Sequence, residues 1–289
     1  MNHVERRRVA MFGLVSGPLL WMIAFLFVPY AVMFTYSFYS RQFPMIVPDF
    51  QLGNYLTLIT DPQYYQVLLR TLKISIFVSL LALVIAYPLT YFLVFRIRSA
   101  RLRSVLYIAV IVPLWVSYLL RAYTWKTILG SQGVLNSFLI WIGVLDEPAE
   151  IFLYSQFAMV IVLTYIYIPF QVMPVYTSLE KIPRNLIEAS KDLGVGRWET
   201  FVRITLPLSV PGILAGMTFT FCLTMGDFVA PFLVGGPDGL MIANVVQVQF
   251  GTAFNWPLGS ALSIVMLVIV LVIISASDRL ERAGRLDLG

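Results

Sequence analysis

Six apolar runs of about twenty residues constrain this chain more than any other feature of its sequence. An α-helix of that length crosses the hydrocarbon core of a bilayer. The composition agrees, because 59% of the residues are hydrophobic and 12% are charged, about half the charged fraction of soluble domains. We therefore predict an all-α membrane protein whose six transmembrane helices lie at 11–38, 72–95, 105–125, 151–176, 208–234 and 258–276.

Basic residues predict which way these spans face. Arginines at positions 6–8 precede the first run, others at 96–103 fill the link between the second and third runs, and more follow the fourth and sixth. Because cytoplasmic loops carry an excess of Lys and Arg, these segments and both termini are predicted to be cytoplasmic. The opposite connections are poor in basic residues. Two short apolar pieces in them, 134–143 and 240–250, are predicted to be interfacial or re-entrant helices.

Several other signals and sites are disfavoured. The first run resembles a signal peptide in its basic flank, but it is too long and lacks a small-residue cleavage site, so an uncleaved span is expected. A single cysteine, Cys222, and a single histidine, His3, predict neither a disulfide nor a metal site. No phosphate-binding loop of the G-x-x-x-x-G-K-[ST] type occurs, so the chain is not expected to hydrolyse ATP alone. The net charge of +5 is explained by topology, and no nucleic-acid partner is expected.

A polar segment at 180–207 interrupts the apolar pattern between the fourth and fifth runs. Pro183 favours the start of a helix, and Gly194 favours its end in a left-handed conformation. An apolar stripe on this helix is formed by Leu186, Ala189, Ser190 and Leu193. A second amphipathic pattern begins near Trp198 and runs to Pro207. The pattern predicts helix, turn and second helix at the inner membrane face, and an ordinary amphipathic helix lying on lipid is an open alternative.

The spelling of this segment resembles the loop signature of permease subunits of binding-protein-dependent ABC importers. Glu188, Ala189 and Ser190 are followed after three residues by Gly194, and after nine more by the sequence ITLP. Ser190 stands where the family pattern has a second alanine. The resemblance implies a coupling helix that docks on a cytoplasmic ATPase subunit. The implied docking residues are Leu186, Glu188, Ala189, Ser190, Asp192, Leu193 and Gly194.

Most of the chain after about Leu68 resembles one permease of the spermidine/putrescine type, from PLWVSYLLRAYTW at 113–125 to WPLGSALSIV at 256–265. The resemblance implies the type I ABC importer permease fold, with a single transmembrane permease domain over 1–289 in the inner (plasma) membrane of a bacterium. It also implies a second homologous permease, two ATPase subunits that bind ATP and Mg, an extracytoplasmic solute-binding protein, surrounding lipid, and no cofactor or catalytic site in this chain. Similar permeases are associated with opines, aminobutyrate-like compounds and aminophosphonates, so these solutes are alternatives to a polyamine.

Charged residues inside spans are candidates for the solute pathway, because charge at the bilayer centre is costly. Two are present, Arg121 and Asp227, and aromatic residues surround the arginine, namely Trp115, Tyr118 and Tyr123. Asp227 would complement an ammonium group, and aromatic faces attract organic cations. The aromatics also fit an interfacial belt. We predict that Arg121 pairs with Asp227 in one state of the transport cycle; the alternative is that Arg121 extends to the outer surface.

Two other functional classes fit the sequence less well. An ion-coupled secondary transporter would use the intramembrane charges, but the polar segment would have no role, and no inverted repeat is visible. A membrane enzyme would need a catalytic set. The carboxylate pairs at Glu147 and Glu150, and at Asp278 and Glu281, lie beside loops or tails and are predicted to be solvated.

Overall fold

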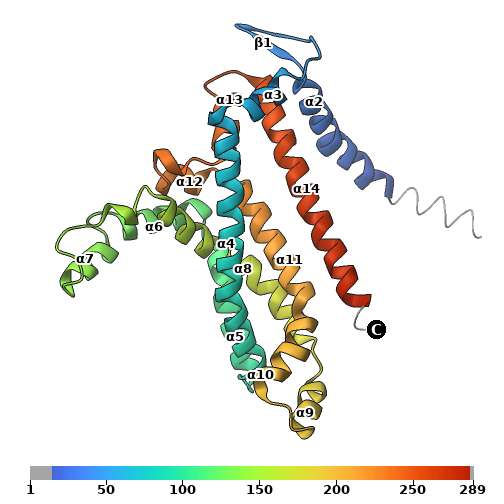
Figure 1. The fold of residues 1–289 in the computed structure, drawn as a ribbon, viewed down its shortest axis with the longest axis vertical. Coiled ribbons are helices and arrows are strands. Elements are labelled where there is room, and N and C mark those ends of the chain that lie inside the picture. Colours follow the sequence, from blue (N-terminus) through green and yellow to red (C-terminus); the bar gives the residue numbers. More distant parts are fainter. Residues whose placement is uncertain (1–14, 287–289) are drawn as a thin grey trace, which may run out of the picture. The chain divides into compact units, whose positions relative to one another are not determined.

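The computed structural model describes residues 15–286 of the chain. Most of the described residues are helical, the helices are joined by turns and loops, and two short strands form an antiparallel hairpin in which Ser40 pairs with Val47 and Gln42 with Met45 (Figure 1). They form two compact units. Unit 1 contains the described residues up to Pro62 together with Val246–Leu267, and unit 2 contains Gln63–Val245 with the described residues from Val268. The arginines at 6–8 and the first four residues of the predicted first span lie outside the described residues.

Unit 1 holds the first span and the connection that follows it. The elements that belong to it wholly or in part are η1 (Ile23–Phe27), α2 (Val28–Tyr36), β1 (Ser40–Gln42), β2 (Met45–Val47), α3 (Gly53–Thr60), the end of α13 (Ile242–Phe250) and the start of α14 (Trp256–Leu286). The end of α2 is bound to α3 by polar contacts. The Asn54 side-chain amide donates to the carbonyls of Ser37 and Tyr39 at 2.9 and 2.8 Å, and the hydroxyls of Ser37 and Tyr55 lie 2.7 Å apart.

Unit 2 holds the remaining spans and the polar segment. Its elements, apart from the ends of α13 and α14 that it shares, are α4 (Pro62–Phe95), α5 (Ala100–Ile111), η2 (Val112–Trp115), α6 (Tyr118–Leu129), α7 (Val134–Trp141), η3 (Glu150–Phe152), α8 (Gln156–Glu180), α9 (Arg184–Asp192), α10 (Arg197–Thr200), η4 (Phe201–Thr205), α11 (Leu206–Met225), α12 (Val229–Val234) and η5 (Pro237–Gly239). The short apolar pieces predicted at 134–143 and 240–250 are the helices α7 and α13.

Among the described residues, five helices are long and apolar enough to cross a membrane: Val15–Tyr36, Pro62–Phe95, Glu150–Glu180, Arg197–Met225 and Trp256–Arg282. A sixth span is present if the pair Ala100–Trp115 and Tyr118–Trp141 counts as one. The predicted third span at 105–125 falls within this pair, which bends by 94°. The bend follows the 3-10 turn η2, in which Pro113 has no N–H to donate and the chain becomes extended at Val116.

The fifth span also ends earlier than predicted. Helix α11 stops at Met225 rather than at Val234, and α12 is a separate short helix after a break at Gly226 and Asp227. Helix α4 begins at Pro62, ten residues before the predicted start at Leu72, since its polar first turns lie outside the apolar run that the prediction followed. Apolar runs therefore locate the spans, while polar and capping residues determine where the helices begin and end.

A π-helical stretch ends two residues before a proline at two places, η1 before Pro29 and η4 before Pro207. A proline inside a helix has no N–H and its ring collides with the carbonyl four residues earlier, and a wider turn relieves both problems. Because of η4, helices α10 and α11 are continuous from Arg197 to Met225. The predicted second amphipathic segment therefore does not stop at Pro207 but runs directly into the fifth span.

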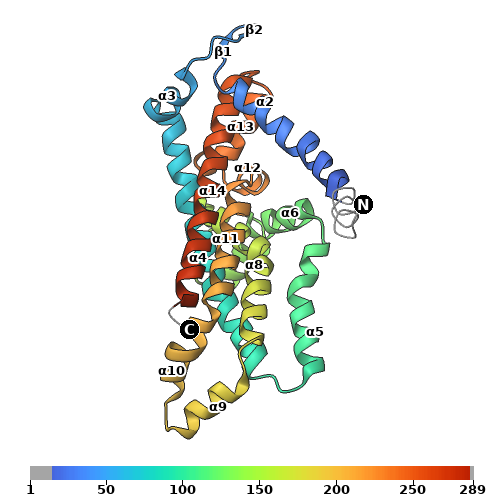
Figure 2. The same cartoon turned by 90° about the vertical axis from the view of Figure 1, so that its right-hand side faces the viewer.

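Helices α8 and α11 form the centre of unit 2 and lie side by side (Figure 2). Gly212 and Gly216, one turn apart on α11, allow this approach. A Cβ at Gly212 would lie 2.5 Å from the carbonyl oxygen of Pro174, and one at Gly216 would lie 2.7 Å from the Gln171 side chain. Small residues four apart are typical of closely packed transmembrane helices. Substituting either glycine would push α8 and α11 apart.

Candidate functional site

The helix α9 is bounded as the sequence predicts. Pro183 is its N-cap residue, and Gly194 has a φ of +78°. The N–H of Val195 donates to the carbonyl of Ser190 at 3.0 Å, and the N–H of Gly194 donates to Lys191 at 2.9 Å. These two bonds form a Schellman motif, which satisfies the last carbonyls of the helix and needs a left-handed residue at the position of Gly194. The direction of the chain after α9 is thus fixed by its backbone.

One face of α9 packs on the rest of unit 2, and the other face is exposed. Ile187 packs against a buried apolar cluster that includes Leu179 and Ile182. The exposed side chains include Leu186, Glu188, Ala189, Asp192 and Leu193, and Leu193 is 83% exposed. Every predicted docking residue except Ser190 is therefore exposed.

Ser190 does not lie on the exposed face with the other predicted docking residues. Its side chain is buried, and its hydroxyl lies 2.7 Å from the hydroxyl of Thr200 on α10. The Thr200 hydroxyl also donates to the carbonyl of Gly196 at 3.1 Å. In this structure the predicted docking residue Ser190 is therefore buried, and its hydroxyl joins α9 to the helix that continues into α11.

The start of α5 and the end of α8 meet next to the polar segment. Arg103 forms an ion pair with Glu180 at 3.5 Å, and the hydroxyl of Tyr176 donates to the same carboxylate at 3.1 Å. The rings of Tyr107 and Tyr176 stack with centroids 4.2 Å apart. The basic link after α4 and the polar segment therefore share one end of unit 2, as the predicted topology requires (Figure 2).

A second polar centre surrounds Asp227, between α11 and α12. One carboxylate oxygen accepts hydrogen bonds from the N–H groups of Val229 and Ala230, at 2.9 and 3.2 Å. The other accepts from the hydroxyl of Tyr167 at 2.7 Å and from the hydroxyl of Tyr118. A carboxylate has about four acceptor positions. Donors of the same chain therefore occupy the buried Asp227 carboxylate. This carboxylate accepts from the first N–H groups of α12 and connects that helix to α6 and α8.

The other pathway candidates lie apart from this carboxylate. The guanidinium of Arg121 is buried, donates to the carbonyl of Ile166 at 3.3 Å and lies 5.9 Å from the Tyr118 ring. Its Nε has no hydrogen-bond partner among the described residues. No ion pair between Arg121 and Asp227 forms within residues 15–286 in this state, nor does the side chain extend to the outer surface. Trp115 is 82% exposed and Tyr123 is also exposed, so neither joins the cluster.

Sequence reasoning missed two parts of this centre. Tyr167 was not distinguished from the other tyrosines of the fourth span, because its bond to Asp227 depends on how α8 packs against the break between α11 and α12, which is a contact between residues 60 positions apart. The second part is a buried polar row between α8 and α11. Thr220 donates to the Gln171 side chain at 3.3 Å, while the Gln171 amide nitrogen and the Thr224 hydroxyl find no partner among the described residues.

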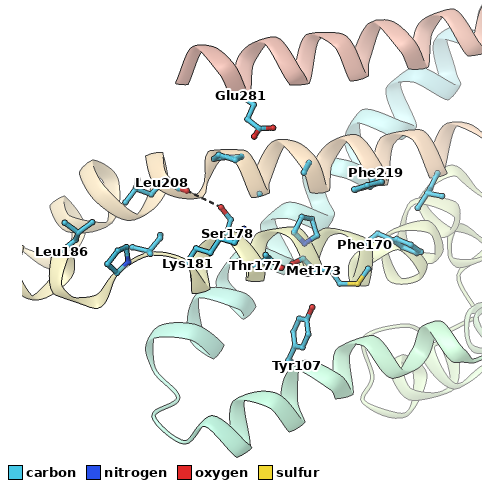
Figure 3. A pocket seen from close by; sticks show the side chains of 17 residues that line it. Tyr107, Phe170, Met173, Thr177, Ser178, Lys181, Leu186, Leu208, Phe219 and Glu281 are labelled. Atoms are coloured by element: carbon cyan, nitrogen blue, oxygen red, sulfur yellow. Dashed lines mark hydrogen bonds between the residues drawn. The ribbon is translucent and has the colours of Figure 1, made fainter. Parts of the chain in front are cut away.

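A cavity of about 1130 Å³ runs along the α8 and α11 face toward the polar segment (Figure 3). Its lining is apolar or hydroxyl-bearing except for two charged residues, Lys181 and Glu281. It extends from Leu223 to Leu186 on α9. Leu223 also lines a smaller hollow of about 340 Å³, which contains Tyr118, Tyr167 and Asp227. The Asp227 centre and the cavity therefore adjoin each other on one face of unit 2.

Comparison with known proteins identifies relatives over most of the chain. Residues 80–283 match the family model described as "Binding-protein-dependent transport system inner membrane component". The spermidine/putrescine transport system permease protein PotB of Escherichia coli K12 is 39% identical over 272 residues, which cover 92% of this chain and 98% of PotB. The inner membrane ABC transporter permease protein YdcU of the same organism is 34% identical over 284 residues, covering 94% and 90%.

Solved structures agree on the fold. A bacterial alginate ABC transporter, in complex with an alginate pentasaccharide-bound periplasmic protein, contains a chain that matches with a TM-score of 0.79 at 20% identity, with 96% of each chain covered. A chain of the MetNI methionine ABC transporter matches with a TM-score of 0.57 at 20% identity, covering 78% of this chain and 99% of that one. The predicted type I ABC importer permease fold is confirmed.

Proposed function

This chain belongs to the family of binding-protein-dependent transport system inner membrane components, and from that membership we propose that it is the permease subunit of an importer for spermidine and putrescine. The observation that carries the proposal is the 39% identity to PotB, which extends over 98% of that protein. A match of this length includes the spans, the polar segment and the outer connections together. The chain itself is a transport component of the inner membrane and not an enzyme.

The proposal includes partners on both sides of the membrane. An ATPase subunit would dock on α9, on which Leu186, Glu188 and Leu193 are exposed. ATP and Mg would be bound by that subunit, of which the importer has two, and not by this chain. A second homologous permease would complete the pore, and an extracytoplasmic binding protein would deliver the solute. In this arrangement residues 1–289 act as one permease domain with both termini cytoplasmic and lipid around the exposed apolar helices.

The route through this subunit is proposed to pass from the Asp227 centre into the cavity between α8 and α11. A carboxylate flanked by Tyr118 and Tyr167 suits an ammonium group, since the rings attract cations and the charges are opposite. Because the two tyrosines already occupy Asp227, an ammonium would have to displace at least one hydroxyl. The closed cluster is then one state of a gate, and solute binding favours the state in which the tyrosines are released.

A second candidate solute is an amino-acid-like zwitterion such as an opine, an aminobutyrate-like compound or an aminophosphonate. One observation favours it: the buried Arg121 guanidinium, whose Nε has no hydrogen-bond partner among residues 15–286, lies 5.9 Å from the ring of Tyr118, and the hydroxyl of Tyr118 donates to Asp227, so one tyrosine contacts both a fixed cation and a fixed anion. A zwitterion would match both charges. A polyamine would match only Asp227.

The test is uptake by the assembled importer in proteoliposomes, with ATP inside and the purified binding protein of the same importer outside. Labelled spermidine, putrescine, an opine and aminobutyrate are compared, each with its competition by the others. We expect uptake of spermidine or putrescine that requires both ATP and the binding protein. Uptake of the zwitterions alone would replace the first candidate by the second, and uptake by this chain without an ATPase would overturn the importer proposal.

A further inference from the structure

Strained aromatic residues mark the connections of this chain that are predicted to face outward. Among residues 15–286, three non-glycine residues have a positive φ: Phe50 at 47°, Tyr154 at 57° and Phe254 at 48°. All three are aromatic, and their side chains are 68%, 55% and 66% exposed. The left-handed conformation brings Cβ close to the following carbonyl, so residues other than Gly, Asn and Asp seldom adopt it. Such strain persists where the surroundings enforce it, often at functional positions.

Tyr154, which lies in unit 2, has a local explanation for its conformation. Its carbonyl oxygen packs on Gly236, where an added Cβ would approach it to 2.5 Å, and the Lys126 ammonium lies 5.6 Å from its ring. Phe50 and Phe254, both in unit 1, have less around them. The Phe50 ring contacts Tyr39 at 5.4 Å, and no ring contact involves Phe254 within the described residues. Internal packing therefore does not account for these two exposed phenylalanines.

The two turns that carry Phe50 and Phe254 are held rigidly. Next to Phe50, the N–H of Gln51 donates to the carbonyl of Phe38 at 2.7 Å. Next to Phe254, the N–H of Asn255 donates to the carbonyl of Gln249 at 2.8 Å. A series of ring contacts at 5.3–6.3 Å joins both turns through Tyr39, Tyr36, Trp256 and Phe250. In Figure 1, α3 and the start of α14 lie at the same end as the hairpin. Both turns are thus connected by one series of ring contacts within unit 1.

We propose that Phe50 and Phe254 are anchor residues on which the extracytoplasmic solute-binding protein docks, an inference that rests on the proposed function. Aromatic anchors within a polar rim are typical of protein interfaces, and here the polar residues Asp49, Gln51 and Asn255 are the chain neighbours of the two phenylalanines. A rigidly held ring loses little conformational freedom on binding. Lipid is a poorer occupant, because partitioning into lipid depends on apolar area and does not require a fixed, unfavourable backbone conformation.

The test replaces each phenylalanine with asparagine, which tolerates the left-handed conformation but removes the ring. The complete importer is reconstituted, and its ATPase rate is measured against the concentration of its purified, spermidine-loaded binding protein. We expect the half-maximal concentration to rise about tenfold or more for Phe50→Asn and Phe254→Asn, with the basal ATPase rate unchanged and the melting temperature not lowered. Ile59→Ala on α3, which removes an equally exposed apolar side chain from an ordinary helix, should change the half-maximal concentration less than about twofold.

The outcomes separate this inference from the proposed function. A wild-type importer that the binding protein does not stimulate would overturn both. If the binding protein stimulates the wild type and the two asparagine variants equally, the docking inference alone is overturned. It is also overturned if the asparagine variants melt at a lower temperature while their stimulation is unchanged, because the rings would then have a structural role. A fluorophore attached through Thr252→Cys, which is exposed in the same turn and leaves Phe254 in place, gives a second measurement in a Cys222→Ser background. A response to the binding protein supports the inference, and quenching by spin-labelled lipid contradicts it.

Discussion

Helix α9 and the Asp227 centre lie in the same unit, but their side chains are used in opposite ways. The carboxylate of Asp227 is buried, and four donors of the same chain surround it. On α9 the charged and apolar side chains are exposed, while capping bonds of the backbone hold the helix in place. In the proposed importer, α9 would offer the ATPase subunit exposed side chains on a helix that its own backbone bonds hold in place. The Asp227 centre, in contrast, is satisfied by its own chain, and a solute would have to replace one of those partners.

The largest effect is expected for Asp227→Ala. It leaves two tyrosine hydroxyls and two N–H groups of α12 without their acceptor in a buried site, and we expect the free energy of unfolding to fall by about 3 kcal/mol or more. Thermal unfolding of the purified subunit in detergent measures this. Asp227→Asn keeps one oxygen for the N–H groups, so it should fold with a smaller loss of stability and should transport less spermidine. Equal stability of Asp227→Ala and the wild type would contradict the conclusion that the hydrogen bonds to Asp227 stabilise the fold.

The next effect concerns the two tyrosines. Tyr118→Phe and Tyr167→Phe each remove one hydrogen bond to a charged group, which contributes about 1.5–3 kcal/mol. Because both hydroxyls donate to the same oxygen, we expect a coupling energy of at least about 0.5 kcal/mol in the double-mutant cycle. Unfolding of the two single variants and the double variant provides the measurement. Additive losses would mean that the hydroxyls do not share Asp227, and Tyr165→Phe serves as a control on the same helix.

On the exposed side of the comparison, Gly194→Val should fold but lose coupling. Valine in the left-handed conformation costs more than about 1–2 kcal/mol, so the turn after α9 opens and the docking face is misplaced. We expect solute-stimulated ATP hydrolysis by the reconstituted importer to fall about tenfold or more, in keeping with a change of that size. Gly196→Val is the matched control, because Gly196 has no positive φ and open space around its Cβ position. Equal coupling in both variants would remove the structural role assigned to Gly194.

The two regions also differ in how far the sequence predicts them. Pro183, Gly194 and the amphipathic spacing are local signals, so the helix α9 and its left-handed end could be predicted residue by residue. Apolar length likewise predicts where the spans are. The Asp227 centre depends on contacts between residues far apart in sequence, and on a 94° bend that a run of apolar residues does not reveal. Tyr167 and the close approach at Gly216 were missed for this reason.

The smallest effect tests how α9 is joined to the fifth span. The Thr200 hydroxyl has two partners, Ser190 and the carbonyl of Gly196, whereas the Ser190 hydroxyl is hydrogen-bonded to Thr200. Thr200→Val therefore leaves a buried hydroxyl without its partner, and it should reduce stability by about 1 kcal/mol. Ser190→Ala leaves Thr200 bonded to Gly196 and introduces the alanine of the family pattern, so its loss should be smaller.

The distribution of distances between spin labels on α9 and α11 should broaden in Thr200→Val and change little in Ser190→Ala. The double variant should resemble Ser190→Ala, because no hydroxyl is then left without a partner. The opposite order, with Ser190→Ala losing more ATPase stimulation than Thr200→Val, would mean that Ser190 contacts the ATPase itself. Its burial in the isolated chain would then be a state that docking reverses, and α9 would resemble the Asp227 centre more closely than its exposed face suggests.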